Sequence, residues 1–344
     1  MKILLTGHHG YIGSVCAPVL AAAGHEVVGL DTLFYRDCDL ASAPSPATET
    51  LLADVRDVRR EQLDGFDAVV HLAALSNDPI GDFSPELTRE INYEATVSLA
   101  RAAREAGVRR FVFSSSCSMY GTSSDEAVDE SAPLKPLTAY AESKVRSEEA
   151  LTELAGPDFA PVSMRNATAY GVSARLRVDL VLNNLVGWAY TTGKVKIMSD
   201  GTPWRPLIHV EDISRAALAA VEAPEDVVRG EAFNVGRDDE NYQVRQLGDI
   251  VHEVVDESEV EYAGSGDPDP RSYRVSFAKL HRTFPELRLT WTARAGAQEL
   301  VAAYRAADLT LGQFESDRFT RLKRLRLLLE RGELDRTLRW RRAA

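Results

Sequence analysis

The sequence predicts an α/β fold built on a doubly wound parallel sheet, with a smaller α/β lobe in the C-terminal part of the chain. Short apolar strands alternate with helices through residues 1–165, and the first strand runs into the first helix through three spaced glycines. After Arg165 the alternation becomes irregular, and a basic segment ends the chain. We therefore expect a first domain over 1–165, to which some later segments return, a second lobe over mainly 166–305 and a helical tail over 306–344.

The composition is typical of a globular enzyme. The 344 residues are 44% hydrophobic and 27% charged, enough for one or two cores. No apolar run is long enough to span a bilayer, and the start of the chain is too short for a signal peptide, so we expect a cytoplasmic protein without a membrane partner. A net charge of −12 argues against nucleic acid as a partner. Three scattered cysteines indicate neither a disulfide framework nor a metal site.

The first strand is expected over residues 2–6 and the first helix over 12–23, with Gly7, Gly10 and Gly13 at the junction. A strand that turns through glycines into a helix brings backbone N–H groups and the positive helix end to one point, which suits a pyrophosphate. The spacing, Gly-x-x-Gly-x-x-Gly, meets the dinucleotide-binding pattern only approximately.

The next strands supply the other parts of a dinucleotide site. A second strand over 26–30 ends at Asp31, whose carboxylate can accept both ribose hydroxyls and would repel a 2′-phosphate, which favours NAD over NADP. A third strand over 51–55 would approach the adenine. A fourth over 67–74 is almost entirely apolar, as a strand covered on both faces should be, and its small final residues would let a cofactor come close.

Ser76 follows the fourth strand, at the edge where open α/β sheets bind ligands. Its alternative role is to cap the following helix. A helix is expected over 91–106 with Asn92 near its start, and a fifth strand over 109–113 leads into Ser114, Ser115 and Ser116.

Tyr140 and Lys144 lie one turn apart if residues 140–154 form a helix. A phenol has a reference pKa of about 10, and an ammonium about 5 Å away favours the phenolate by roughly 3 kcal/mol. With the hydroxyl of Ser116, these groups can move a proton on and off a sugar or alcohol oxygen while hydride moves at its carbon. Many helices carry Tyr-x-x-x-Lys by chance, so the prediction depends on the preceding nucleotide-binding pattern.

Beyond residue 165, amides and separated arginines are the informative residues. Guanidinium groups match phosphate oxygens, so the separated arginines Arg175, Arg177 and Arg205, together with paired amides, suit a substrate diphosphate, although each alone is commonly a surface ion-pair residue. Residues 204–212 predict a short strand entering a helix. The segment 318–342 holds ten basic and three acidic residues with a helical leucine stripe. It could pack on the body of the protein, on a subunit neighbour, or on an anionic partner.

Residues 1–305 resemble the extended short-chain dehydrogenase/reductases of the NAD-dependent nucleotide-sugar epimerase/dehydratase family. The resemblance rests on the segments 6–13, 71–74, 114–116 and 205–212 and on Asp31, Asp54, Asn92, Tyr120, Gly121, Tyr140 and Lys144. It implies a Rossmann-type domain holding NAD, a smaller lobe holding a nucleoside diphosphate sugar, and a homodimer formed through the helices over 92–106 and 140–154.

Motifs and resemblance together assign each site residue. The catalytic set is Ser116, Tyr140 and Lys144. The NAD site comprises Gly7, Gly10, Tyr11, Ile12, Gly13, Asp31, Asp54, Val55, Leu72, Ala73, Ala74, Asn92, Ser114, Tyr140 and Lys144. The substrate site comprises Ser76, Cys117, Ser118, Asn166, Thr168, Asn183, Asn184, Arg205 and Arg271.

Two departures from the family pattern narrow the activity. The 4,6-dehydratases carry an Asp-Glu pair where this chain has Cys117 and Ser118, which argues against a dehydratase or other lyase. Cys117 is either a proton donor at a second carbon or a small buried thiol. The asparagine that UDP-galactose 4-epimerases place near the substrate phosphates is Thr168 here.

The sequence therefore predicts an isomerase of carbohydrate metabolism, a nucleotide-sugar epimerase that acts at C4 through a transient 4-keto intermediate. A nucleotide-sugar 4-ketoreductase is the alternative. A 4,6-dehydratase is a further possibility, but Cys117 and Ser118 supply no carboxylate for it. A non-catalytic NAD-binding protein is another, but such a protein would not need the intact Tyr140/Lys144 pair.

Overall fold

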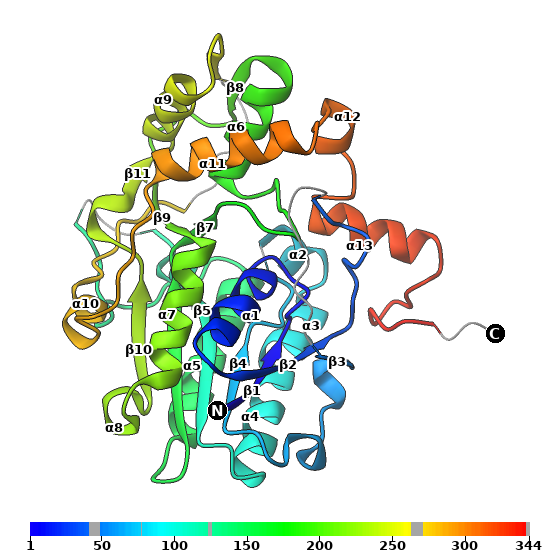
Figure 1. Cartoon of the computed structure of the whole chain (residues 1–344), viewed down its shortest axis with the longest axis vertical. Helices are drawn as coiled ribbons and strands as arrows, with labels where there is room; N and C mark the ends of the chain where they lie inside the picture. The colour runs from blue at the N-terminus through cyan, green and yellow to red at the C-terminus, as the bar shows by residue number, and fades with distance from the viewer. Residues whose placement is uncertain (41–48, 77, 123–125, 263–270, 342–344) are drawn as a thin grey trace.

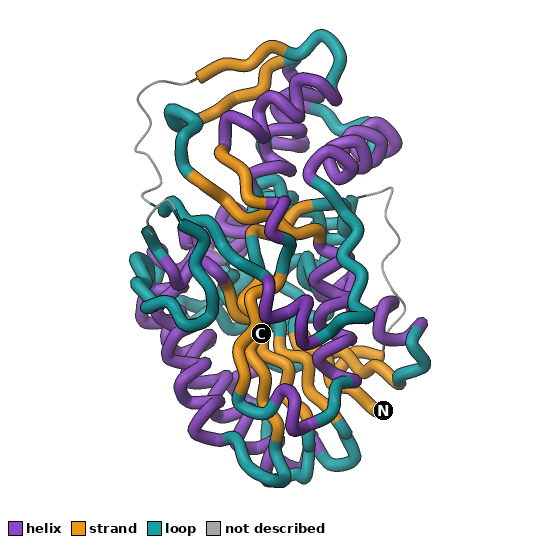
Figure 2. Tube along the Cα trace, turned by 90° about the vertical axis from the view of Figure 1, so that its left-hand side faces the viewer, coloured by secondary structure: helices purple, strands orange, loops and turns teal. Residues whose placement is uncertain are grey.

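The computed structural model describes residues 1–40, 49–76, 78–122, 126–262 and 271–341. Its largest element is a seven-stranded sheet in which every neighbouring pair is parallel (Figures 1 and 2). Across the sheet the strands are β10 (Glu231–Val235), β6 (Ala160–Asn166), β5 (Arg110–Ser116), β4 (Ala68–His71), β1 (Lys2–Thr6), β2 (Glu26–Asp31) and β3 (Glu49–Leu52). This parallel sheet confirms the predicted fold.

Helices cover both faces of the sheet. Successive strand residues point to opposite faces, so Ile3 and Leu5 pack with α1 (Gly13–Ala22) and α7 (Val210–Glu222) on one side. Leu4 packs on the other side with α4 (Ala95–Glu105) and α5 (Ala139–Leu154). The strand order reverses between β1 and β4, so their carboxyl ends open a crevice, the usual ligand site of a doubly wound sheet.

The smaller lobe has its own core, in which Leu182, Val195, Leu247 and Leu300 are fully buried. It lies above the carboxyl edge of the large sheet in Figure 2. Its sheets are β11 (Asn241–Gln243), β9 (Trp204–His209) and β7 (Thr168–Tyr170), and β12 (Glu259–Tyr262) with β8 (Lys194–Ile197). Its helices are α6 (Val181–Thr192), α9 (Val244–Val254) and α11 (Ala293–Ala306).

Shorter elements connect these parts. They are η1 (Val55–Asp57), η2 (Arg60–Leu63), α2 (Asp78–Phe83), α3 (Pro85–Thr88), η3 (Arg89–Glu94), η4 (Cys117–Tyr120), α8 (Glu225–Val228), η5 (Asp238–Glu240), α10 (Ala278–Thr283), α12 (Leu311–Phe314) and α13 (Arg321–Glu330).

Three predicted boundaries shift for local reasons. β3 spans Glu49–Leu52 instead of the predicted 51–55, and it ends early because the Asp54 side chain caps η1 by accepting from the Arg56 N–H. The helix predicted over 91–106 starts as a π-helical turn, η3, before α4. β5 continues through Ser116, so the serines belong to the strand itself.

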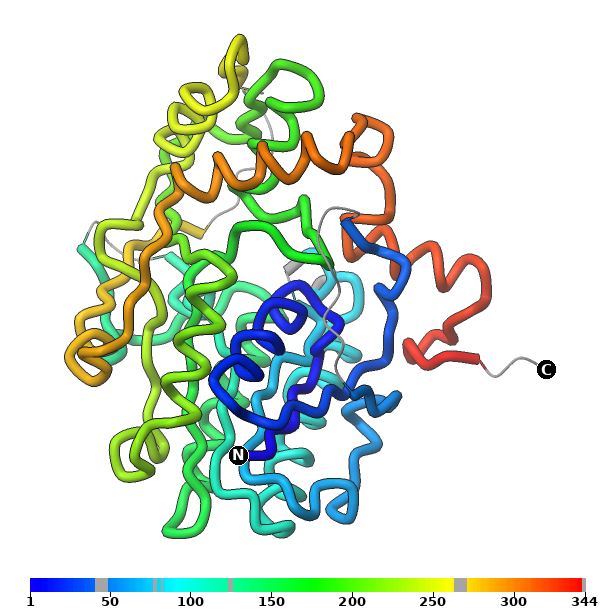
Figure 3. The backbone as a smooth tube through the Cα atoms, viewed as in Figure 1, coloured from blue at the N-terminus to red at the C-terminus, as the bar shows by residue number. Residues whose placement is uncertain are grey.

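The basic C-terminal segment packs on the body of the protein. Leu325 and Leu328 of α13, and Leu334 and Leu338 after it, are buried in the same apolar cluster as Leu30. Figures 1 and 3 show this segment beside the chain that follows β2. In the described part of the chain, no helix combines the length and the apolar character needed to cross a membrane.

Candidate active site

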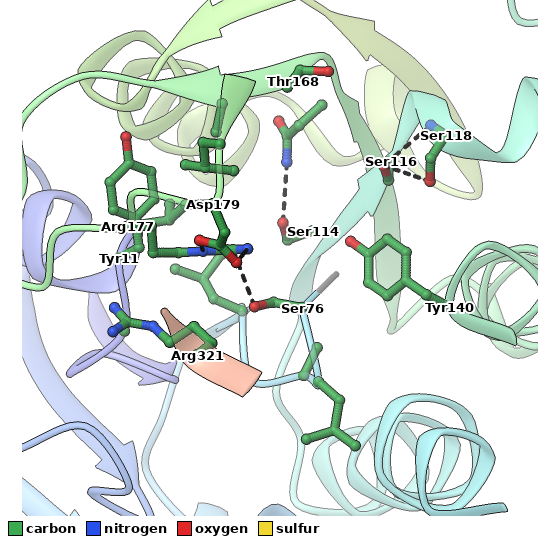
Figure 4. Close-up of a pocket in the computed structure, with 18 of the residues that line it drawn as sticks. Tyr11, Ser76, Ser114, Ser116, Ser118, Tyr140, Thr168, Arg177, Asp179 and Arg321 are labelled. Atoms are coloured by element: carbon green, nitrogen blue, oxygen red, sulfur yellow. Dashed lines mark hydrogen bonds and ion pairs between the residues drawn. The ribbon is translucent and has the colours of Figure 1, made fainter. Parts of the chain in front are cut away.

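A cavity of about 650 Å³ lies between the large sheet and the smaller lobe. Its walls come from the carboxyl ends of β1, β2, β4 and β5, from the start of α5, and from segments of the smaller lobe (Figure 4). Every residue assigned to NAD except Asn92 lines it, as do all three catalytic candidates.

The glycine turn after β1 leaves no room for side chains. Gly7 has φ +72° and its N–H donates to the Leu30 carbonyl at 2.8 Å. A Cβ on Gly13 would lie 2.2 Å from the Gly7 oxygen and 2.5 Å from the His8 Cα. The bare backbone between β1 and α1 can therefore approach a ligand closely.

Asp31 is held at the cavity wall by its neighbours. Its two carboxylate oxygens accept from the His9 N–H at 3.0 Å and the Leu33 N–H at 2.7 Å. A fixed carboxylate and a glycine turn with bare backbone, with Ala73 and Ala74 also lining the cavity, fit a dinucleotide with a free ribose 2′-hydroxyl.

Asp54 also lines the cavity, but Arg56 engages its carboxylate. The Arg56 Nη2 donates to Oδ2 at 2.6 Å and Nε donates to Oδ1 at 2.9 Å. Burial raises the pKa of the Asp54 carboxyl, and the hydrogen bonds and charge of Arg56 outweigh it, so the net pKa is lowered. Asp54 therefore lines the cavity as a carboxylate that is already paired with Arg56.

The catalytic candidates converge on one side of the cavity. Thr138 caps α5 by accepting from the Ala141 N–H at 3.1 Å, which places Tyr140 in the first helical turn. Ser116 ends β5, donates to the Ser118 hydroxyl at 3.0 Å and accepts from the Ser118 N–H at 3.2 Å. Figure 4 shows the Tyr140 hydroxyl directed toward Ser116.

Lys144 follows Tyr140 by one turn of α5 and is 4% exposed. Its Nζ donates to the Ser114 carbonyl at 2.6 Å, 5.6 Å from the centre of the Tyr140 ring. Burial lowers the pKa of Lys144 to about 7, with Glu148 partly opposing the shift. Burial, with the charge of Lys144, also lowers the pKa of nearby His71 to about 3, so this imidazole stays neutral. Near neutral pH, part of the Lys144 population therefore lacks the ammonium charge that the sequence analysis assumed. An anion formed nearby would favour the charged form again.

The lowered pKa of Lys144 predicts a pH-dependent stability. Between its folded pKa of about 7 and the ordinary value of 10.5, the unfolded chain binds the proton that the folded chain releases, so stability rises with pH. We expect Lys144→Met, measured as cofactor-free protein by urea unfolding from pH 7 to 9, to remove a slope of up to about 1.4 kcal/mol per pH unit. Identical slopes in the two proteins would contradict a buried, titrating Lys144.

Four predicted ligand residues lie outside the cavity. Arg175 forms an ion pair with Asp39, and the polar atoms of the other three are used by buried backbone groups. Asn92, assigned to NAD, accepts from the Leu75 N–H at 2.8 Å and donates to the Leu75 carbonyl at 3.0 Å. Asn183 accepts from the Gly171 N–H at 3.0 Å and donates to the Arg177 carbonyl at 2.8 Å. Cys117 is fully buried and donates to the Arg165 carbonyl at 3.0 Å.

Cys117 is therefore the small buried thiol of the two alternatives. Burial raises the pKa of its thiol well above the ordinary range, which disfavours the thiolate. Asn92 and Asn183 instead fix the chain around Leu75 and Gly171. None of the three residues lines the cavity, so the structure offers no support for the prediction that they contact a ligand directly.

The other predicted substrate residues line the cavity: Ser76, Ser118, Asn166, Thr168, Asn184, Arg205 and Arg271. Arg205 links two of these segments by donating through Nη1 to the Arg271 carbonyl. Asn166 donates to the Ser114 hydroxyl at 3.0 Å, which joins the end of β6 to the end of β5. Their contacts with a substrate stay a prediction.

Arg177, which the sequence analysis named for a substrate diphosphate, lines the cavity, and so do Tyr35, Asp179 and Arg321, which no sequence pattern indicated. Arg177 forms an ion pair with Asp179 at 2.9 Å and donates to Ser76 at 3.2 Å. Tyr35 lines the cavity from the chain after β2, and Arg321 from α13. Figure 4 shows Tyr11, Arg177, Asp179 and Arg321 across the cavity from Tyr140, Ser116 and Ser118. The sequence shows that the C-terminal segment is basic, but no pattern in it predicts that Arg321 lines this cavity.

Comparison with known proteins agrees with this geometry. Residues 3–236 match the model of the "NAD dependent epimerase/dehydratase family". The chain is 33% identical over 286 residues to a UDP-glucose 4-epimerase of Corynebacterium glutamicum, covering 78% of this chain and 85% of the relative.

Solved structures give the same picture. A Thermus thermophilus UDP-glucose 4-epimerase in complex with NAD superimposes with a TM-score of 0.75 at 26% identity, over 89% of this chain and 100% of that one. The dTDP-glucose 4,6-dehydratase DesIV of Streptomyces venezuelae, with NAD bound, superimposes with a TM-score of 0.76 at 26% identity, over 91% of this chain and 100% of that one.

Proposed function

Because the chain belongs to the NAD-dependent epimerase/dehydratase family and uses NAD, we propose that it is a nucleotide-sugar epimerase that inverts C4 of the sugar. The observation that carries the proposal is the convergence of Ser116, Tyr140 and Lys144 at one cavity wall without an added carboxylic acid. Such a set handles one hydroxyl proton, which is all that inversion through a ketone requires.

The distribution of carboxylates favours epimerisation over elimination of water. Among the described side chains, the acids that line the cavity are Asp31, Asp54 and Asp179. Asp31 accepts backbone N–H groups, Asp54 is paired with Arg56, and Asp179 is paired with Arg177 across the cavity from Tyr140. Elimination needs a second acid-base group beside the sugar, and the position after Ser116 is the buried Cys117.

In the proposed reaction Tyr140 takes the proton from the sugar C4 hydroxyl, and Ser116 hydrogen-bonds the same oxygen. NAD held by the glycine turn and Asp31 would supply the hydride acceptor for C4 and the hydride donor for the return step. Lys144 stabilises the phenolate electrostatically, and the phenolate in turn favours the ammonium form of Lys144. The 4-keto sugar then turns within the cavity to present its other face, and Tyr140 returns the proton to the C4 oxygen as hydride returns to C4.

We propose UDP-hexoses as the first substrates to test, since the relatives named as UDP-glucose 4-epimerases cover most of the chain. We further propose a cytoplasmic homodimer joined through α4 and α5. The support is the family resemblance, which implies a subunit contact on these two helices.

The test is to incubate the purified protein with UDP-glucose, UDP-galactose and their dTDP counterparts and to follow each by proton NMR. The expected result is interconversion of C4 epimers without added cofactor. Reduction of a 4-keto sugar with net consumption of added NADH would make the protein a 4-ketoreductase instead. Accumulation of a 4-keto-6-deoxy sugar would make it a dehydratase.

A further inference from the structure

The C-terminal segment 318–341 covers the chain that follows β2, which forms the ribose side of the cavity. Leu325, Leu328, Leu334 and Leu338 pack in one apolar cluster with Phe34. Because these leucines are buried, the segment is a fixed part of the wall.

Polar contacts fasten the same segment at three further points. The Trp340 Nε1 donates to the Thr32 carbonyl at 2.5 Å, and Arg324 pairs with Asp37 at 2.9 Å. Arg56, which holds Asp54, also donates to the Thr337 carbonyl at 2.8 Å. The segment thus bridges the two stretches, after β2 and after β3, that would surround an adenosine.

Arg321, at the start of α13, reaches the cavity from this segment. Its side chain is almost fully buried at 2% exposure and lines the cavity. The guanidinium lies 4.2 Å over the Tyr35 ring, and its Nη2 donates to the Arg175 carbonyl at 2.6 Å. Its Nη1 has no hydrogen-bond partner among the described residues.

The surroundings of Arg321 leave positive charge uncompensated. Arg177 is its charged neighbour on the cavity wall, and the nearby carboxylate, Asp179, is already paired with Arg177. Burial and the like charge of Arg177 lower the pKa of Arg321, while Tyr35, Cys38 and Asp179 oppose them. A guanidinium cannot lose its proton in a protein, so an anion in the cavity would supply both the missing charge and the missing acceptor.

We propose that segment 318–341 is a clamp on bound NAD, in which Nη1 of Arg321 donates to the NAD pyrophosphate. Figure 4 shows Arg321 on the same side of the cavity as Tyr11 of the glycine turn, and Asp31 lines the same cavity. The Asp31 carboxylate disfavours a 2′-phosphate there, and the substrate diphosphate is assigned to the side of Arg205 and Arg271. NAD then leaves only when α13 separates from the chain after β2.

The test compares Arg321→Met, which keeps the length of the side chain, with Arg326→Met on the exposed face of the same helix. The holoenzyme is mixed with isotope-labelled NAD, and exchange is followed by native mass spectrometry. We expect Arg321→Met to exchange NAD at least about tenfold faster, the size of one charged hydrogen bond, and Arg326→Met to match the parent.

A competition arm identifies the contacted group. ADP and adenosine are each titrated against labelled NAD. Arg321→Met should lower the affinity for ADP by about tenfold or more and leave the affinity for adenosine unchanged. Equal weakening of both competitors, or unchanged NAD exchange, would overturn the proposal. If Arg321→Met does not fold, Arg321→Lys and Arg321→Gln replace it, and the lysine variant should retain ADP more tightly than the glutamine variant. The reverse order would also overturn it.

Discussion

Replacement of Tyr140 by phenylalanine is expected to lower kcat for epimerisation by about 10²–10⁴-fold, the usual contribution of a positioned acid-base group. The change removes one oxygen and leaves the Thr138 cap of α5 and the Lys144 bond to Ser114 in place. NAD content should therefore be unchanged. Initial rates by NMR or coupled assay, with NAD quantified after denaturation, measure both quantities.

The matched control is Tyr262→Phe. Tyr262 is 48% exposed at the end of β12 and does not line the cavity, so its loss should leave kcat unaltered. If Tyr140→Phe retained activity near that of the parent, another group would have to carry the proton, and the proposed mechanism would be wrong.

Gly13→Ala is expected to prevent retention of NAD and to destabilise the protein by at least about 3 kcal/mol, the upper range for overpacking. The new methyl would sit 2.2 Å from the Gly7 oxygen and 2.5 Å from the His8 Cα. Both are backbone atoms, so no side chain can rotate away, and the turn itself must move. Thermal unfolding and the NAD content of the purified protein check the two effects.

Gly312→Ala provides the comparison, because a Cβ there meets no atom within 4 Å. It should keep both NAD and the melting temperature of the parent. A Gly13→Ala protein with normal NAD content would mean that the glycine turn is not the cofactor cradle.

Local sequence patterns predicted the large sheet and the core of the candidate site. The apolar strand, glycine turn and helix around Gly7 and Gly13, the acid at Asp31, and the one-turn spacing of Tyr140 and Lys144 all act over a few residues. In a parallel sheet the carboxyl ends of the strands meet at one edge, so residues that follow different strands can be assigned to the same site.

Contacts between distant segments could not be predicted in this way. Asn92 and Cys117 look like ligand residues in the sequence, but their polar atoms are bonded to backbone groups of Leu75 and Arg165. Arg321 stacks on Tyr35, which is separated from it by most of the chain. No periodicity or motif encodes such pairings, since they depend on how the finished elements pack.

The position of β10 limits how the chain can be divided. It pairs with β6, which would otherwise be the border of the sheet, although the two strands are separated by most of the smaller lobe. All seven residues of β6 are buried. A fragment ending near residue 165 would leave a long apolar row of unpaired N–H and C=O groups, a template for edge-to-edge aggregation. The nucleotide-binding half should therefore stay soluble only when the later segment that supplies β10 is expressed with it.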